Sequence, residues 1–207
     1  MTACAGLLLA AGEGRRLGTP KALVEVDGEL LVDRAARMLA DGGCSPVVVV
    51  LGAAAPQVTA RARLADAIVV VNDDWSQGMG SSLRTGLTVL TELGAASAVV
   101  ALVDQPKVGS DVVRRLLDHP GGKPAVAAAY DGRQGNPVRL DASVWAEVAA
   151  AAEGDVGARA WMRSHPESVE VVACDDLGVD DDIDTVEDLA RLFEGRRMEP
   201  PVMKVQP

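Results

Sequence analysis

Short apolar segments alternate with longer amphipathic segments along the first two thirds of the chain. The apolar segments have the length of β-strands and lack polar alternation, as strands covered on both faces of a sheet do. The expected strands are Ala5–Ala10, Pro46–Leu51, Ala67–Val71, Ala98–Val103 and Ala125–Ala129. Helical patterns separate them at Leu31–Asp41, Gln57–Leu64, Ser81–Leu93 and Ser110–Asp118. This order predicts a three-layer α/β fold with a doubly wound, mostly parallel sheet, Rossmann-like in its architecture.

The alternation of apolar and amphipathic segments stops after Tyr130, where residues 131–137 are rich in turn formers. Beyond them the pattern fits a short antiparallel strand at an edge of the sheet, then two helices, a strand and a last helix. The ranges are Val138–Leu140, Ala142–Ala152, Gly157–Arg163, Val169–Cys174 and Val186–Glu194. We expect residues 1–194 to form a single domain, and the three prolines of residues 195–207 predict a loosely ordered tail.

Composition narrows the class of protein. Five aromatic residues against 48% hydrophobic residues predict an aliphatic core. A net charge of −10 argues against a broad nucleic-acid-binding face. No apolar run reaches the ~20 residues of a membrane span, and we see no signal peptide. Cys4, Cys44 and Cys174 form no C-x-x-C motif, which favours reduced thiols. We therefore expect a cytoplasmic protein that contacts neither nucleic acid nor membrane.

The segment LLLAAGEGRRLGTPKAL, Leu7 to Leu23, is the richest in candidate chemistry. The first expected strand ends there in a loop with three glycines and three cations. Glycines allow backbone N–H groups to approach an anion, and cations neutralise phosphate charge. The spacing matches neither a Walker A loop nor the dinucleotide fingerprint G-x-G-x-x-G. The pattern predicts a polyphosphate site, and a plain strand-to-helix turn with solvated cations is the alternative.

Two aspartates are candidate metal ligands. Asp104 directly follows a buried strand, where a carboxylate is costly unless a charge compensates it. Mg²⁺ binds carboxylates together with phosphate oxygens, so Asp104 and Asp184 are expected to hold one Mg²⁺. The alternatives are that Asp104 starts a turn or caps a helix and that Asp184 caps the last helix.

Residues 77–83, with two glycines followed by two serines at a helix start, offer hydroxyl and N–H groups to a ligand. Ser81 or Ser82 as an ordinary N-cap is the alternative. His119 and His165 each precede a proline and are expected to be exposed and without a role.

Taken together, the motifs resemble the MobA-like nucleotidyltransferase family, which includes molybdenum cofactor cytidylyltransferases and guanylyltransferases. The resemblance runs from Leu9 to about Leu192. Besides the first loop, similar to L-A-[AG]-G-x-x-x-R-x-G-x-x-K, five segments carry it in order. They are Gly78–Leu83, Asp104–Pro106, Gly135–Val138, Gly154–Arg159 and Asp182–Thr185.

The resemblance implies a set of site residues. Arg16, Lys21 and Asp104 would be catalytic, with Arg16 and Lys21 on the triphosphate and with Asp104 and Asp184 on Mg²⁺. Nucleotide contacts would come from Leu9, Ala10, Ala11, Gly12, Gly14, Arg16, Gly18, Lys21, Asn72, Ser81 and Ser82. Acceptor contacts would come from Gly135, Asn136, Pro137, Asp155 and Arg159. Many relatives have His where Asn136 stands, which puts the acceptor contacts in doubt. Many also have Met where Gln105 stands, a departure that is harmless for the metal.

The resemblance also implies a reaction. Cytidylyl members resemble Ala-Ala-Gly in the first loop and guanylyl members Ala-Gly-Gly, and this chain has Ala10-Ala11-Gly12. The Ala11 methyl group would crowd a purine, so we expect CMP transfer from CTP to molybdopterin, with release of pyrophosphate and a molybdoenzyme as client.

Three alternatives remain open. The same fold serves GTP or other phosphorylated acceptors, such as sugar phosphates, methylerythritol phosphate and phospholactate. Some similar chains are described as NAD(P)H-dependent reductases of a nicotine-derived pigment, nicotine blue. A nucleotide-binding chaperone without turnover is the third. The sequence leaves the oligomeric state open.

Overall fold

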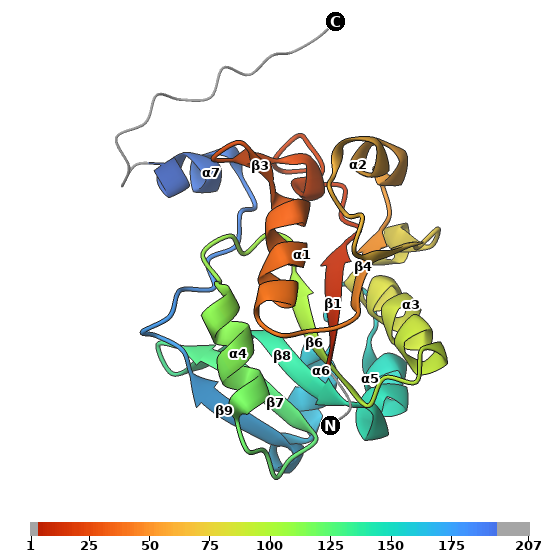
Figure 1. The fold of residues 1–207 in the computed structure, drawn as a ribbon, viewed down its shortest axis with the longest axis vertical. Helices are drawn as coiled ribbons and strands as arrows, with labels where there is room; N and C mark the ends of the chain where they lie inside the picture. Colours follow the sequence, from red (N-terminus) through yellow and green to blue (C-terminus); the bar gives the residue numbers. More distant parts are fainter. Residues whose placement is uncertain (1–3, 194–207) are drawn as a thin grey trace, which may run out of the picture.

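The computed structural model describes residues 4–193, and a central sheet organises them (Figure 1). Seven strands lie in the order β5-β4-β1-β6-β8-β7-β9. Their bounds are β1 Ala5–Ala10, β4 Val47–Leu51, β5 Ile68–Val71, β6 Ser97–Leu102, β7 Ala125–Tyr130, β8 Arg133–Asp141 and β9 Val169–Ala173. Strand β8 runs antiparallel to both of its neighbours, and all other pairs are parallel. The predicted α/β class with a mostly parallel sheet is confirmed.

Helices cover both faces of the sheet and enclose two aliphatic cores. On one face lie α1 (Leu31–Asp41), α2 (Ala55–Arg61) and α4 (Ser110–Asp118), and on the other α3 (Met79–Glu92), α5 (Trp145–Ala151) and α6 (Arg159–Ser164). Strand β1 is buried on both sides, because Leu8 faces the first core and Leu7 the second. The largest fully buried side chain is that of Trp161.

Two strands differ from their expected environment. Strand β8 is longer than expected and lies inside the sheet between β6 and β7, so the prediction of an edge strand is wrong. Only Asp131 and Gly132 turn the chain ahead of it, both with positive φ. Strand β5 is an edge strand on which Ile68 and Val71 are exposed, so it is not covered on both faces as predicted.

Several short elements were not anticipated. A hairpin of β2 (Glu25–Val26) and β3 (Glu29–Leu30) turns at Asp27 and Gly28, both with positive φ. Short 3-10 helices occur at Lys21–Leu23, Trp75–Gln77, Ala142–Val144 and Pro166–Ser168. The third of these replaces the first turn of the helix expected from residue 142.

The last helix, α7, spans Val186–Phe193, and its Leu189 packs against the first core (Figure 1). The predicted tail, 195–207, lies outside the described residues. Among residues 4–193, no helix is long and apolar enough to cross a membrane. His119 and His165 are half-buried rather than exposed, because His119 approaches Glu170 and His165 stacks on Trp161.

Candidate active site

The glycine-rich loop begins where β1 ends, at the carboxyl edge of the parallel strands, where ligands bind in folds of this type. Gly14 has φ of +68°, and a Cβ atom there would lie 1.9 Å from the carbonyl oxygen of Thr19. The Gly14 carbonyl accepts hydrogen bonds from the N–H groups of Leu17 and Gly18. The buried Leu17 side chain anchors the loop, while Arg15 and Arg16 stay exposed.

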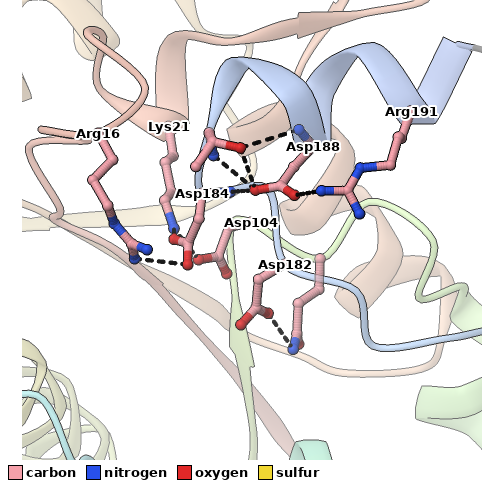
Figure 2. Close-up of polar contacts among 9 residues, drawn as sticks. Arg16, Lys21, Asp104, Asp182, Asp184, Asp188 and Arg191 are labelled. Carbon is pink, nitrogen blue, oxygen red and sulfur yellow. Dashed lines mark hydrogen bonds and ion pairs between the residues drawn. The ribbon is translucent and has the colours of Figure 1, made fainter.

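Lys21 lies between two carboxylates (Figure 2). Its Nζ donates hydrogen bonds to Asp104 Oδ2 and to Asp184 Oδ1, each at 2.5 Å. Arg16 Nη2 donates to the second oxygen of Asp184 at 2.7 Å. The side chains of Lys21 and Asp104 are only 17% and 15% exposed. The three residues predicted to be catalytic and the two predicted to hold a metal therefore form one cluster.

The electrostatics of the cluster favour the charged forms of Lys21 and Asp184. Burial alone would lower the pKa of Lys21, but the charge and hydrogen bonds of Asp104 and Asp184 outweigh burial and raise that pKa above its ordinary value. The hydrogen bond from Lys21, followed by the charges of Lys21 and Arg16, lowers the pKa of Asp184. Lys21 and Asp184 therefore stabilise each other's ionised forms.

The backbone brings the two aspartates together from distant parts of the chain. The N–H group of Ile183 donates to the carbonyl oxygen of Asp104 at 2.9 Å, and the Ile183 side chain is buried. Gln105 Nε2 adds a second connection, because it donates to Asp182 Oδ1 at 2.9 Å. Burial and the nearby charge of Asp104 raise the pKa of Asp182.

Thr185, and not Asp184, caps the last helix. Thr185 Oγ1 accepts a hydrogen bond from the N–H group of Asp188, and Asp188 Oδ2 accepts from the N–H group and the hydroxyl of Thr185. This reciprocal arrangement is a capping box. The alternative that Asp184 serves as the cap is therefore wrong, and its carboxylate remains available to the cluster.

The carboxylates fit a hard divalent cation. Asp104 Oδ1 is buried and has no hydrogen-bond partner, so one oxygen of a partly buried carboxylate is unused. Two carboxylates with room for further oxygen ligands are the donor set that Mg²⁺ or Mn²⁺ takes together with phosphate. Within residues 4–193, no group of three or more His, Cys, Asp or Glu side chains could hold a metal ion. The remaining ligands would therefore come from substrate and water.

Two adjoining hollows flank the cluster. The first, about 380 Å³, is lined by the loop from Ala11 to Arg15, by Lys21 and Asp104, and by Trp75 to Gly78. The second, about 440 Å³, is lined by Gln134 to Asn136, by residues 155–159, and by Asp180 and Asp182. They share four lining residues, Leu9, Met79, Leu102 and Asp155. A molecule in one hollow would therefore lie beside a molecule in the other.

The predicted nucleotide residues divide between the first hollow and its surroundings. Leu9, Ala11, Gly12, Gly14, Lys21 and Ser82 line the first hollow, while Ala10, Arg16 and Gly18 do not. The buried amide of Asn72 donates to the hydroxyl oxygens of both Ser81 and Ser82. Asn72 and Ser81 line a separate hollow behind α3. Both serines lie within the first turn of α3, so the alternative that either is its N-cap is wrong.

The predicted acceptor residues gather at the second hollow. Gly135, Asn136, Asp155 and Arg159 line it, and Pro137 does not. Asp155 also has a structural role, because its Oδ1 accepts from the N–H group of Met79 at the start of α3. Gly78 packs there against Gly154, with no room for a side chain.

Sequence reasoning missed several lining residues. Trp75 and Gln77 form a wall of the first hollow, and Met162 and Arg163 form part of the second. Gly52 packs closely beside Trp75 and Ala11, since a Cβ atom at residue 52 would be 2.6 Å from Trp75 Cβ and 2.8 Å from Ala11 Cβ. The only sequence signal for Gly52 was its place directly after β4, at the carboxyl edge of the sheet.

The fold and the site together define a phosphate-binding α/β transferase. Residues 6–170 match the family model of the MobA-like NTP transferase domain. The chain belongs to this family and is a nucleotidyltransferase.

Three known proteins show the range of its relatives. Nicotine blue oxidoreductase of Paenarthrobacter nicotinovorans is 44% identical, and the match covers 91% of this chain and 95% of that protein. Molybdenum cofactor guanylyltransferase of Cereibacter sphaeroides is 40% identical over 60% of this chain and 62% of that protein. The structure of Rv0371c from Mycobacterium tuberculosis in complex with manganese has a TM-score of 0.78 at 28% identity, over 94% of this chain and 100% of that chain.

Proposed function

We propose that this chain transfers CMP from CTP to a phosphorylated acceptor in a reaction that depends on a divalent metal, with Mg²⁺ as the ion and molybdopterin, or its molybdenum-bound form, as the acceptor. The observation that carries the proposal is the position of the Lys21–Asp104–Asp184 cluster. Lys21 and Asp104 line the first hollow together with the four residues that the two hollows share, and Asp184 contacts Lys21. Nucleotide in the first hollow and acceptor in the second would meet at this cluster.

The roles of the residues follow from their charges and positions. Backbone N–H groups of the loop from Gly12 to Gly14, with Arg16 and Lys21, would bind the triphosphate. Asp104 and Asp184 would hold Mg²⁺, which neutralises charge on the phosphates when bound. Gly135, Asn136 and Arg159 would position the acceptor.

The reaction needs no protein base. A terminal phosphate oxygen of the acceptor is already anionic and attacks the α-phosphorus of CTP. The bond from that phosphorus to the bridging oxygen of the β-phosphate breaks, and pyrophosphate leaves with both electrons of the bond. The contributions of the protein are alignment and charge neutralisation, the main sources of catalysis in transfers at phosphorus.

Preference for CTP rests on Ala11. Its methyl group lies close to Gly52, and Ala11 lines the first hollow. The methyl group narrows the space beside the loop, which favours a pyrimidine over a purine.

The molybdenum cofactor guanylyltransferase supports the acceptor half of the proposal, and the manganese complex of Rv0371c supports a divalent metal. The nicotine blue oxidoreductase favours a second candidate function, reduction of a heteroaromatic pigment, because its match spans nearly the whole of both chains. The first loop is a poor dinucleotide fingerprint, which counts against this second candidate.

Calorimetry with CTP, GTP, ATP and NADPH, each with and without Mg²⁺, tests the proposal. Selective binding of Mg-CTP, weakened in Asp104→Ala and unchanged in Asp181→Ala, is the expected result. Asp181 is the matched control because it is exposed and pairs with Lys107 at the surface. Binding of NADPH alone, indifferent to Mg²⁺ and to Asp104, would support the redox candidate instead.

A further inference from the structure

The ammonium group of Lys21 lies where a bridging cation would lie. Both of its hydrogen bonds go to the carboxylates that fit a divalent metal, and both are 2.5 Å long. A Mg²⁺ ion with oxygen ligands at about 2.0–2.1 Å would lie between the same two carboxylates. The lysine and the metal therefore compete for one position.

We infer that Lys21 is a built-in substitute for the metal ion. Its ammonium group must leave the Asp104–Asp184 pair before a divalent cation can bind there. The inference rests on the proposed function, because it assumes that the carboxylate pair takes a metal. It assigns Lys21 a second task, namely keeping metal away from the carboxylate pair before nucleotide binds, in addition to binding phosphate.

The surroundings of Lys21 explain why the lysine occupies this position. Without a cation between them, two half-buried carboxylates would repel each other, since charge repulsion is strong where water is scarce. Lys21 is held at the start of a 3-10 helix directly after Pro20, so its side chain emerges at a fixed point beside the pair. The lysine thus relieves the repulsion at the cost of occupying the metal position.

A polyphosphate would provide the lysine with another partner. Lys21 lines the first hollow together with Gly12, Gly14 and Arg15, so Nζ can turn from the carboxylates toward an anion in that hollow. Bound nucleotide would then draw the lysine away, and the metal would take its place. By thermodynamic linkage, nucleotide and metal must strengthen each other's binding by the same factor.

The test is a titration of the protein with Mn²⁺ alone, in which the electron paramagnetic resonance signal measures the free ion. In the absence of any nucleotide, Lys21→Met should bind Mn²⁺ between about 5-fold and 150-fold more tightly than the wild type, the usual range of coupling between sites. Lys21→Arg keeps the cation and should bind Mn²⁺ no more tightly than the wild type.

Lys107→Met is the matched control, because it makes the same change in a surface ion pair with Asp181. Its Mn²⁺ affinity should equal that of the wild type. Circular dichroism checks that each variant is folded. If Lys21→Met is folded and binds Mn²⁺ no more tightly than the wild type, or if Lys21→Arg binds as tightly as Lys21→Met, the inference is wrong. The deciding comparison contains no nucleotide, so a failure of CTP to bind counts separately against the proposed function.

Discussion

The N–H group of Ile183 donates a hydrogen bond to the carbonyl oxygen of Asp104 at 2.9 Å, and this bond joins the segments that carry the Asp104 and Asp184 carboxylates. Asp104 follows β6 in the middle of the sheet, while Ile183 belongs to the segment that leads from β9 to α7. The residue after Ile183 is Asp184, whose carboxylate meets that of Asp104 at Lys21. The site therefore depends on how the 174–185 segment is held.

Thr185→Val tests the capping of α7. Valine keeps the shape but removes the hydroxyl that accepts from Asp188 and donates to it. Loss of such a cap costs about 1 kcal/mol of unfolding free energy, within a range of about 0.5–2 kcal/mol. We also expect Mg-CTP to bind more weakly, because Asp184 immediately precedes the cap. Denaturant unfolding and calorimetry measure the two effects. Thr88→Val, on the exposed side of α3, should change stability by no more than about 0.5 kcal/mol.

Arg115→Gln tests the clamp at the start of the same segment. The guanidinium of Arg115 donates to both carboxylate oxygens of Asp176, at 2.5 and 2.8 Å, and these hydrogen bonds lower the pKa of Asp176 below its ordinary value of 3.8. A carboxyl group with a lowered folded pKa contributes stability above its unfolded pKa, and this contribution is lost as the pH falls through the folded value. The variant should therefore bring the Asp176 pKa back toward 3.8.

Carbon-13 titration of the Asp176 carboxyl group by nuclear magnetic resonance measures this shift. The variant should also lose less stability than the wild type between about pH 4 and pH 2. Arg61→Gln, at the exposed end of α2, is the control and should leave the Asp176 titration unchanged. If the pKa of Asp176 in Arg115→Gln equals that in the wild type, the ion pair does not form in solution.

Gly78→Ala tests the backbone contact between the two hollows. Gly78 has φ of +100°, and a Cβ atom there would lie 2.5 Å from backbone atoms of Gly154. Overpacking of this kind costs about 1–3 kcal/mol, and the positive φ adds strain. Unfolding in denaturant should show the loss, and affinity for Mg-CTP should fall with it. Gly122→Ala meets no atom within 4 Å and should be nearly neutral. Equal losses of stability in Gly78→Ala and Gly122→Ala would contradict the close contact between Gly78 and Gly154.

Ala11→Gly tests the choice of base. Removing the methyl group widens the first hollow, so Mg-GTP should gain affinity relative to Mg-CTP by about tenfold or more, the discrimination that one methylene group commonly provides. Competition calorimetry gives the ratio. Ala127→Gly removes a buried methyl group from β7, which lines neither hollow, and should lower stability without changing the ratio. An unchanged ratio in Ala11→Gly would remove the case for CTP.

Local pattern was sufficient to predict the parallel strands and main helices in the first half of the fold and the first loop, but not the short β2–β3 hairpin. Parallel strands covered on both sides are continuous apolar runs, and the loop after β1 carries its glycines and cations in an uninterrupted segment. Asp104 was predictable for the same reason, since a charge at the end of a buried strand stands out.

The features that the sequence did not predict depend on contacts between residues that are distant along the chain. The insertion of β8 between β6 and β7 is set by pairing with both neighbours, which its local pattern does not encode. The burial of Asn72 against Ser81 and Ser82 requires the close approach of the residues after β5 to α3. The proximity of Asp104 and Asp184 was expected from the sequence, but the position of Lys21 between their carboxylates was not, because it depends on contacts among three distant segments.

The most direct test of the central claim is transfer of label from CTP labelled at the α-phosphate to molybdopterin, with pyrophosphate measured in parallel. The account predicts labelled dinucleotide and pyrophosphate in equal amounts, dependent on Mg²⁺ or Mn²⁺. Turnover should persist in Asp181→Ala and fall below about a tenth in Asp104→Ala. Full turnover in Asp104→Ala would contradict the account. It would also be contradicted if no nucleotide gave labelled product while NADPH was oxidised in the presence of a heteroaromatic pigment.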